Sequence, residues 1–443
     1  MEGTVTQKQQ IHAGWDAEGQ AGLASWEQVA ETIGLDLEGT ARETKALQRK
    51  REISSAKDLL RLILFYVSSN WSLRLVGIWA LLQGIGSLSD VAILKRVRNS
   101  QRWIGTLVVG LLQKRATALQ SMSGVRLRVV DATTIGIPGG SGMDWRLHLS
   151  LDLGNLCLDE VTLTDQQGGE SLTRFTTQSN EIVVADGAYP FASGMGPVFQ
   201  SGAGLVVRIH WRNMPLLGAQ EQRFEIIPWL KTLNSLSETS VSMHTPQGQF
   251  PLRLMACPLP PEQAAEARRR TRQRHKHKRK RLNENTLLAA GFVLVLTNLS
   301  AETWPPALVL VLYRMRWQIE LSIKRLKSLL EFDHLRAKDP RLVQTYLLTK
   351  LLLALFVDQM TNPVSLQHPD WFDDLERPLS VYRLTALCYA ALRQIIAGLW
   401  VSALPLFFGR LQRYICDSPR ARPQQLAWVR AFIQHISVSR SFP

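Results

Sequence analysis

Cysteine is scarce in this sequence. Four cysteines occur among 443 residues, at Cys157, Cys257, Cys388 and Cys416. They lie far apart and form no C-x-x-C pair, which argues against a zinc site and against a disulfide framework. Isolated thiols fit a reducing compartment, and we therefore expect a cytoplasmic protein.

The sequence also lacks a long uninterrupted apolar stretch. Residues 1–20 are polar and contain no signal-peptide core. The longest apolar runs, 351–357 and 395–408, are shorter than the roughly 20 residues that a membrane-spanning helix needs. We expect no membrane segment.

Acidic residues are outnumbered by basic ones. The chain has 37 Asp plus Glu against 52 Lys plus Arg, a formal charge of +15. This excess favours a polyanionic partner, either nucleic acid or an anionic membrane surface. A hydrophobic content of 45% and a charged content of 20% are typical of a globular protein, and the length allows several structural units.

The positive charge is most concentrated in residues 268–281, RRRTRQRHKHKRKR. Because like charges repel at this density, a self-packed helix is not expected here. A solvated surface is the simplest interpretation, but the concentration favours contact with DNA phosphates. The candidate DNA-binding residues of this segment are Arg268, Arg269, Arg270, Lys276, Lys278, Arg279, Lys280 and Arg281.

Residues 1–120 have the apolar spacing of helices. Within them, 72–100 reads as a helix, a glycine-containing turn and a second helix that begins after Ser87 or Ser89 and carries Lys95, Arg96 and Arg98. This pattern is compatible with a helix-turn-helix that binds DNA, and equally with an ordinary helical hairpin.

From residue 125 the pattern changes to strands. Three apolar or alternating stretches, VRLRVVDA, WRLHLSLDLG and CLDEVTLTD, are followed by a short helix in GGESLTRFTT and by strands in EIVVADGAY and GLVVRIHW. The second and third stretches look like antiparallel neighbours. Three strands, a helix and a further strand are the order of an α/β ribonuclease-H-like core.

Later segments alternate in character. Residues 240–257 read as a hairpin that turns near 246–248, and 291–299 as a buried strand. Residues 304–337 read as one long helix, and 341–440 are helical and rich in apolar residues.

Two aspartates occur in matched contexts. Asp131 follows RLRVV and Asp186 follows EIVVA, so each is expected at the end of an apolar strand. That edge of an open α/β sheet is where ligands bind, although a strand-end Asp is also a common turn residue. Glu320 is the one acidic residue in the stretch YRMRWQIELSIKRLK (313–327).

On a helical wheel Tyr313, Arg316, Glu320, Lys324 and Lys327 share a strip about 80° wide. A solvated face with i,i+4 ion pairs is the simple explanation. The alternative is metal chemistry, because Mg²⁺ prefers a few carboxylates together with water and substrate oxygens. Two such ions about 3.5–4 Å apart can activate a nucleophile and stabilise a phosphoryl transition state.

The spacing Y-x2-R-x3-E-x6-K at Tyr313, Arg316, Glu320 and Lys327 resembles the signature of bacterial insertion-sequence transposases of the IS-four family. VVDATT and VVADGAY are similar to the family's contexts for its two catalytic aspartates. The resemblance covers roughly residues 55–345. It implies an α/β fold: a ribonuclease-H-like catalytic core interrupted by a β-rich insertion, with helical N- and C-terminal regions.

The resemblance also implies residue roles and partners. Asp131, Asp186 and Glu320 would be the DDE triad that binds two Mg²⁺ ions, for which Mn²⁺ can substitute. Tyr313, Arg316 and Lys327 would contact phosphates at the transposon end. The partners would be the terminal inverted repeats, the target DNA and a second copy of the chain, in a nucleoid-associated protein.

Some relatives hold a flipped base with an aromatic side chain from the insertion. Phe292 is the nearest candidate, followed by Trp211 and Trp304, although packing in the core is the simpler role for all three.

These observations predict five regions. They are a helical DNA-binding region (1–120), the first part of the core (121–212), a β-rich insertion with the basic segment (213–290), the second part of the core with the Glu320 helix (291–345), and a helical region suited to dimerisation (346–443).

The predicted activity is cut-and-paste DNA transposition by metal-dependent cleavage at the transposon ends and strand transfer into target DNA. Two alternatives stay open on the sequence. One is a nuclease of the same fold without strand transfer, and the other is a catalytically inactive, transposase-derived DNA-binding protein. Intact Asp131, Asp186 and Glu320 argue against the second.

Overall fold

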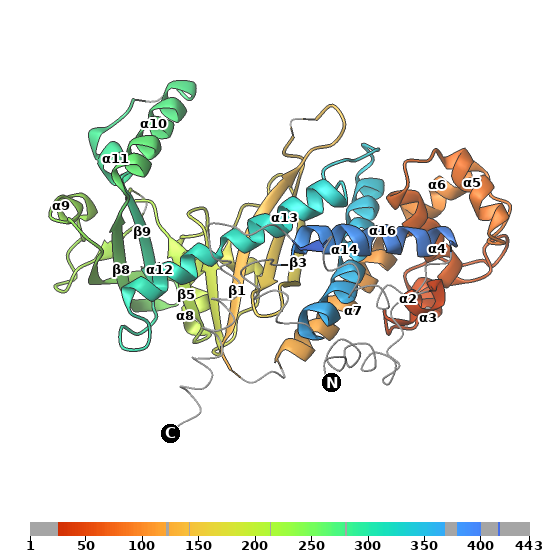
Figure 1. Cartoon of the computed structure of the whole chain (residues 1–443), viewed down its shortest axis with the longest axis horizontal. Coiled ribbons are helices and arrows are strands. Elements are labelled where there is room, and N and C mark those ends of the chain that lie inside the picture. The colour runs from red at the N-terminus through yellow and green to blue at the C-terminus, as the bar shows by residue number, and fades with distance from the viewer. Residues whose placement is uncertain are drawn as a thin grey trace, which may run out of the picture. The chain divides into compact units, whose positions relative to one another are not determined.

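The computed structural model describes residues 25–120, 124–140, 142–212, 214–279, 281–367, 379–399, 415 and 416. The chain divides into two compact units (Figure 1). The helical unit comprises Met1–Ser121, Gly136–Gly142 and Lys324–Ala427, and the sheet unit comprises Met122–Ile135, Met143–Ile323 and Trp428–Pro443. Each unit is described by itself.

The described part of the helical unit is built from helices whose starts are set by capping side chains. Ser55, Ser72 and Ser89 each accept a hydrogen bond from a backbone N–H in the first turn, which satisfies donors that have no partner within the helix. Ser89, and not Ser87, therefore begins the second helix of the predicted pair. The helices are α2 (Trp26–Glu31), α3 (Leu37–Glu43), α4 (Ala56–Ser68), α5 (Leu73–Leu82), α6 (Asp90–Asn99), α7 (Gln101–Gln120), α14 (Pro340–Gln367) and α16 (Val381–Ala397).

Helix α14 is the central element of this unit. It packs against α7, α16 and α4. Among the described residues, one stretch, Pro340–Thr361 of this helix, is long and apolar enough to cross a membrane by length and composition, with 22 residues and a mean hydropathy of 1.3. However, 78% of its most apolar window is buried inside the protein, as in the core helix of a globular protein.

The sheet unit contains a nine-stranded mixed sheet in the order β3-β2-β1-β4-β5-β9-β8-β7-β6. Its strands are β1 (Arg126–Ile135), β2 (Trp145–Asp152), β3 (Cys157–Asp165), β4 (Glu181–Ala185), β5 (Gly204–Arg208), β6 (Leu216–Leu217), β7 (Ser237–Thr245), β8 (Gly248–Pro258) and β9 (Phe292–Thr297). The prediction that β2 and β3 are antiparallel neighbours is confirmed, and so is the hairpin of β7 and β8.

Strand β1 is longer than predicted. It pairs in parallel with β4 only as far as Val129, but its antiparallel pairing with β2 continues to Ile135. Asp131 therefore lies inside β1, not at its end. It lies two residues beyond Val129, the last residue of β1 that pairs with β4. Of the two strands, only β4 therefore ends where the sequence predicted the edge of the sheet.

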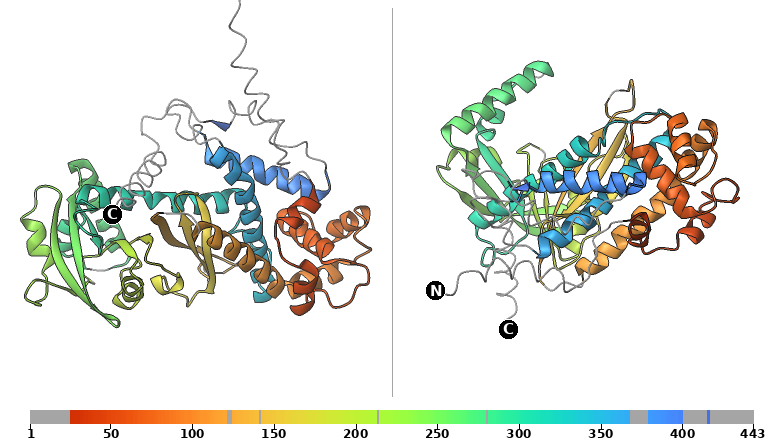
Figure 2. Two further views of the ribbon diagram at one scale, coloured as in Figure 1. Left: turned by 90° about the horizontal axis from the view of Figure 1, so that it is seen from below. Right: turned by 45° about the vertical axis from the view of Figure 1, so that its right-hand side comes forward.

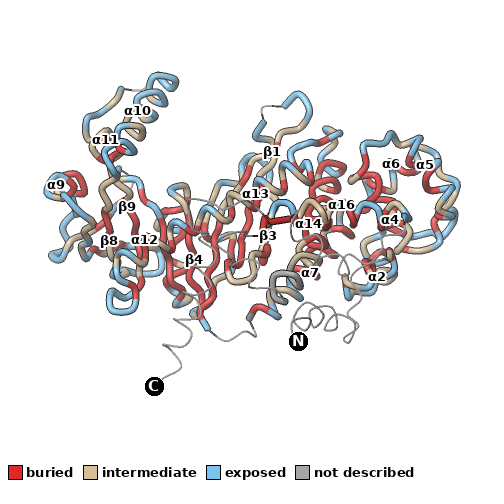
Figure 3. The backbone as a smooth tube through the Cα atoms, in the orientation of Figure 1, coloured by how far each residue is buried: buried red, intermediate tan, exposed pale blue. Residues whose placement is uncertain are grey.

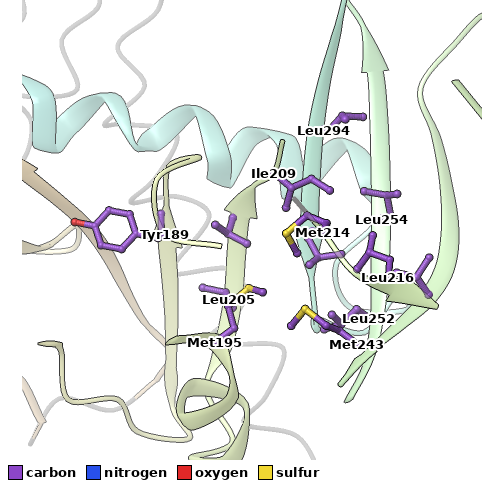
Figure 4. Close-up of a cluster of buried hydrophobic side chains, with 14 of the residues drawn as sticks. Tyr189, Met195, Leu205, Ile209, Met214, Leu216, Met243, Leu252, Leu254 and Leu294 are labelled. Atoms are coloured by element: carbon purple, nitrogen blue, oxygen red, sulfur yellow. The ribbon is translucent and has the colours of Figure 1, made fainter. Parts of the chain in front are cut away.

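Helices cover both faces of the strands next to β1 (Figure 2, left). On one face Val130, Val183 and Leu205 pack with Met195 and Val198 of α8 (Ala192–Gln200), part of the cluster in Figure 4. Strand alternation directs Asp131, the neighbour of Val130, to the opposite face. Helix α12 (Pro306–Met315) packs on β4 and β5, with Val309 and Leu312 buried.

The predicted long helix is divided in two. Helix α12 ends at Met315 and α13 (Trp317–Leu329) begins after one intervening residue. At the junction the Arg316 N–H donates to the Tyr313 carbonyl three residues earlier (3.1 Å), a tighter turn than that of an α-helix. The short helix predicted in 168–177 is a single 3₁₀ turn, Leu172–Arg174.

Helix α10 (Pro261–His277) contradicts the expectation that the basic segment forms no helix of its own. It projects from the ends of β8 and β9, and most of its surface is exposed (Figures 2 and 3). Its first turns contain Pro261 and Glu262, which suit a helix start. Further along, Glu266 forms ion pairs with Arg269 and Arg270, which offsets part of the repulsion between the basic side chains. Two further helices, α9 (Ile226–Lys231) and α11 (Glu284–Ala289), lie in this part of the unit.

A buried group of charged side chains joins the first residues of β1 and β4. Arg126 donates to Glu181 (2.6 Å), and Arg128 forms ion pairs with Asp159 (2.7 Å) and Glu181 (3.0 Å). Asp152 and Glu160 complete the group. Since charges are buried only when they are paired, this network fixes the alignment of β1 with β4 and β3.

Candidate functional site

Asp131 and Asp186 come together through the register of two parallel strands. Arg126 pairs with Glu181, and the pairing continues to Val129 and Val184. Carrying this register forward by two residues places Asp131 beside Asp186, at the spacing of adjacent strands, about 4.8 Å. The strand register therefore brings the two aspartates to one place on the sheet, as the sequence predicts.

Arg316 connects the first aspartate to Glu320. Its Nη1 lies 3.5 Å from Asp131 Oδ2, and its Nη2 forms an ion pair with Glu320 Oε1. Its guanidinium also lies 6.0 Å from the centre of the Tyr313 ring, within the range of a cation–π contact. Arg316 thus contacts the first aspartate and two other residues of the spacing Y-x2-R-x3-E-x6-K, Tyr313 and Glu320. The fourth, Lys327, lies in the last turn of α13.

The environment of Asp131 disfavours its charged form. Burial is the main cause, and it raises the pKa of Asp131 to about 6, with the negative charges of Asp186 and Glu170 acting in the same direction. The N–H of Ala132 and the charge of Arg316 oppose this rise. An additional positive charge nearby would favour the charged form of this carboxylate.

The oxygen atoms gathered here fit Mg²⁺. Carboxylates are the ligands that this ion prefers, and both Asp131 and Asp186 are only partly exposed. Glu320 is engaged by Arg316, and among the described residues no three acidic, histidine or cysteine side chains are close enough to hold a metal ion as they stand. Glu320 could join the two aspartates only by leaving Arg316.

Two residues that the sequence did not single out, Tyr189 and Glu170, interact electrostatically with Asp131 and Asp186. The hydroxyl of Tyr189 is buried and has no hydrogen-bond partner in the described part of the chain. Asp131, Glu170 and Asp186 all raise the pKa of this phenol, after the larger effect of burial. The only sequence signal was the position of Tyr189 in VVADGAY, whereas nothing in GGESLTR marked Glu170.

Comparison with known proteins agrees with this geometry. Residues 123–356 match a family model described as a transposase DDE domain, and this range contains both aspartates and Glu320. The chain belongs to the DDE transposase family. It is similar to insertion-sequence transposases of the IS-four type and is a DNA-transposing enzyme.

Individual relatives show how much of the transposase is shared. The InsL protein of insertion sequence element IS186A from Escherichia coli (strain K12) is 39% identical over 355 residues, which are 78% of this chain and 96% of InsL. The transposase for insertion sequence element IS421 from Escherichia coli is 39% identical over 356 residues, with the same coverage. The transposase for insertion sequence element IS231F from Bacillus thuringiensis subsp. israelensis is 37% identical over 79 residues, 18% of this chain and 16% of that protein.

The basic segment of the transposase is divided between anchoring and exposed side chains. Arg268 Nε donates to the Leu287 carbonyl (3.2 Å) and so attaches α10 to α11. Arg269 and Arg270 share Glu266. The other predicted residues that the structure describes are exposed, namely Lys276, Lys278, Arg279 and Arg281, while Lys280 lies outside the described residues.

The candidates for holding a flipped base differ in accessibility. Trp304 is 1% exposed and belongs to the core, so the packing role applies to it. Phe292 and Trp211 are partly buried against the apolar cluster of Figure 4. Arg212 lies 5.0 Å from the centre of the Trp211 ring.

Helices α5 and α6 form the predicted helical pair in residues 72–100. Lys95 and Arg98 are exposed on α6, and Arg98 forms an ion pair with Asp339 (2.9 Å). This arrangement is compatible with both interpretations of the pair, a DNA-binding motif and a plain hairpin.

Proposed function

We propose that this transposase moves its own element by cut-and-paste transposition. It would cleave DNA at the terminal inverted repeats and join the freed 3′ ends to target DNA. The observation that supports this most is that Arg316 pairs with both Asp131 and Glu320, while the strand register places Asp186 next to Asp131, on a sheet whose strand order β3-β2-β1-β4-β5 suits a ribonuclease-H-like core. On this proposal, β6, β7 and β8 belong to the β-rich insertion.

Asp131, Asp186 and Glu320 would hold two Mg²⁺ ions, or Mn²⁺ in their place. When bound, such ions supply positive charge to the scissile phosphate and lower the pKa of the attacking water or hydroxyl. Asp131 and Asp186 would fix the position of that charge because both belong to the rigid sheet. Arg316 would neutralise negative charge on the phosphate once Glu320 has left it.

Each chemical step exchanges one phosphorus–oxygen bond for another. In cleavage, a water oxygen attacks phosphorus, the water proton passes to solvent, and the 3′ oxygen of the transposon strand departs. In strand transfer, that 3′-hydroxyl attacks a phosphate in the second DNA, and the target strand's own 3′ oxygen departs. The same carboxylates can serve both steps because each reaction builds negative charge on the non-bridging oxygens of the phosphate that is attacked.

Positive side chains would hold the DNA around the reacting phosphate. Tyr313, Arg316 and Lys327 would contact phosphates near the cleavage point, since Arg316 contacts both Asp131 and Tyr313 and Lys327 lies in the last turn of α13, the helix that carries Glu320. The exposed cations of α10 would contact the backbone further along. We assign α5 and α6 to recognition of the end.

Two copies would act together on paired ends. Each chain has one set of these three carboxylates, whereas an element has two ends to cut. Two copies therefore allow both ends to be processed in one complex, and we assign the pairing of copies to residues 346–443. A protein with these partners would be found on the nucleoid.

An assay for joined DNA tests the proposal against its two alternatives. The transposase is incubated with Mg²⁺, a supercoiled plasmid and a labelled duplex that carries the inverted repeat bordering its gene and a free 3′-hydroxyl. We expect labelled duplex joined to plasmid. Cleavage of uncut ends without joined product would indicate a nuclease, and binding without either product would indicate an inactive DNA-binding protein.

A further inference from the structure

The face of α5 that is exposed to solvent is apolar. Leu75, Ile78, Leu81 and Leu82 lie on it, Trp71 precedes the helix, and these five residues form the α5 face. Each is between 45% and 78% exposed, and they are five of the thirteen large hydrophobic side chains that are exposed in the described part of the chain. A single exposed leucine is ordinary, whereas large apolar side chains gathered on one surface typically mark a place where another molecule binds.

The opposite face of α5 attaches the helix firmly to its own unit. Val76, Trp79 and Ala80 are buried there. The Trp79 ring stacks on Phe65 of α4 with 3.8 Å between the ring centres, and its Nε1 donates to the Ala397 carbonyl (3.1 Å). The α5 face is therefore presented by a rigid element, which lowers the entropy that binding costs.

Three of the exposed side chains lie on one strip of the helix. Leu75, Ile78 and Leu82 are separated by three and four residues and, at about 100° per residue, share a strip about 60° wide. Apolar residues at alternating intervals of three and four form the seam through which two helices pack side by side. Because this strip is exposed, it offers such a seam to a second helix.

The chemistry of the α5 face does not suit DNA. Arg74 is the only charged residue of α5, and its Nε lies 3.6 Å from Asp90 Oδ2 at the start of α6. Proteins bind the DNA backbone chiefly with cations that neutralise phosphates, and leucine side chains cannot do this. Exposed cations occur instead on α6, at Lys95 and Arg98. The α5 face therefore favours a protein partner.

The area of the α5 face fits a pair of copies. Its five side chains together expose roughly 500 Å², in the range of the largest functional patches on single chains, about 300–600 Å². Two copies packed face to face would bury roughly 1,000 Å², about the least that a specific interface needs. The surface also matches itself, because a strip with this spacing packs against another strip of the same kind.

We propose that the α5 face is a contact surface between two copies of the transposase, in which α5 of one copy packs against α5 of the other. This inference rests on the proposed function, because paired ends require two copies, and it adds a contact outside residues 346–443. The two copies are related by a twofold axis, so each offers the same surface. The contact holds two α6 helices at a fixed separation, one for each DNA end.

The oligomeric state of the full-length protein tests this inference without relying on catalysis. Sedimentation velocity is recorded at several concentrations, in the absence of DNA, for the parent, for the double variant Ile78→Glu with Leu82→Glu, and for Val109→Glu. Val109 is the matched control, since it is 51% exposed on α7 of the same unit. We expect a parental dimer whose dissociation constant rises about 100-fold or more in the double variant, because carboxylates are buried there without partners, and is unchanged in the control.

Disulfide crosslinking locates the contact without introducing charge. Leu75→Cys, Ile78→Cys and Leu82→Cys are oxidised one at a time by oxygen with copper phenanthroline. Since the position nearest a twofold axis meets its own counterpart, at least one of the three should give a covalent dimer. The parent, whose four cysteines are buried or partly buried, and Val109→Cys should give none.

The possible failures are separable. Circular dichroism melting checks that the double variant folds, which is expected because both substitutions are at exposed positions. A monomeric parent, or a folded double variant that dimerises like the parent, would overturn the inference, and the α5 face would then belong to another part of the chain or to a different protein. A parent that dimerises through α5 but joins no labelled DNA end to plasmid would contradict the proposed function and leave this contact standing.

Discussion

Arg316 forms ion pairs with both Asp131 and Glu320, and so joins a strand residue to a residue of the helix that follows it. The break between α12 and α13 makes this possible, because Arg316 occupies the junction. A guanidinium can contact two carboxylates at once because its donors form a planar fork. The same side chain would be released to a phosphate when a metal replaces it.

We predict that Arg316→Ala lowers the rate of end cleavage by about 100-fold or more, because it removes a fixed positive charge from the reacting phosphate. Arg314→Ala is the matched control, since Arg314 is exposed two residues earlier. Arg316→Lys should recover only part of the activity, because lysine keeps the charge but not the fork. Circular dichroism checks that the helices persist. Small and equal reductions in the cleavage rate for Arg316→Ala and Arg314→Ala would contradict this role and support the simpler interpretation of the stretch as a solvated charged surface.

Exposed cations of α10 should control the salt dependence of DNA binding. Replacing Arg272, Arg274, Lys276 and Lys278 by Gln is expected to weaken binding to all sequences. For every DNA phosphate that is no longer neutralised, the slope of log K against log[salt] should become shallower by about 0.9. Arg268→Gln should instead lower the melting temperature with little change in slope, because Arg268 anchors α10 to Leu287. Titrations by fluorescence anisotropy at several salt concentrations decide between these effects.

The buried charge network should be necessary for stability. Arg128→Met leaves Asp159, Glu160 and Glu181 without one of their cations, and breaking a buried pair typically costs about 3–5 kcal/mol. Arg223→Met removes an exposed pair with Glu225 and should cost at most about 1 kcal/mol. Urea unfolding followed by circular dichroism measures both. A similar small destabilisation in both variants would show that the network is dispensable.

His148 should make the protein sensitive to acid. It is 0% exposed, and burial, followed by the charges of Arg174 and Arg146, lowers its pKa from 6.5 to about 4. As pH falls below 6.5, the unfolded chain takes up a proton that the folded chain refuses until about pH 4. Stability therefore decreases through this window, by up to about 3 kcal/mol at 1.36 kcal/mol per pKa unit. His148→Asn should unfold with a weaker pH dependence than the parent between pH 4 and 6.5. Equal pH dependence would contradict this assignment.

The residues of the candidate site could be named from the sequence because their signals are local. Apolar runs marked β1 and β4, and each run led directly to an aspartate. The wheel placed Arg316 and Glu320 on one face, and their ion pair confirms it. Only the meeting of Arg316 with Asp131 required the tertiary fold.

The sequence-based predictions that the structure contradicts failed because the features depend on tertiary contacts or on nearby charges. The extension of β1 beyond Asp131 depends on pairing with β2, which the polar residues DATT do not signal. Helix α10 begins before the basic segment and includes Glu266, which pairs with Arg269 and Arg270. Glu170 lies in a loop after β3 that is anchored by Arg146 and Arg174, a relationship that no spacing reveals.

The central claim is that Asp131, Asp186 and Glu320 perform the chemistry and do not merely support the fold. The most direct measurement compares cleavage and binding of one labelled transposon-end duplex by the parent and by Asp131→Asn, Asp186→Asn and Glu320→Gln. We predict that each variant binds the end in a gel-shift assay with nearly parental affinity, whereas nicking in Mg²⁺ falls about 10³-fold or more. Nicking by Asp186→Asn at the parental rate would contradict the account.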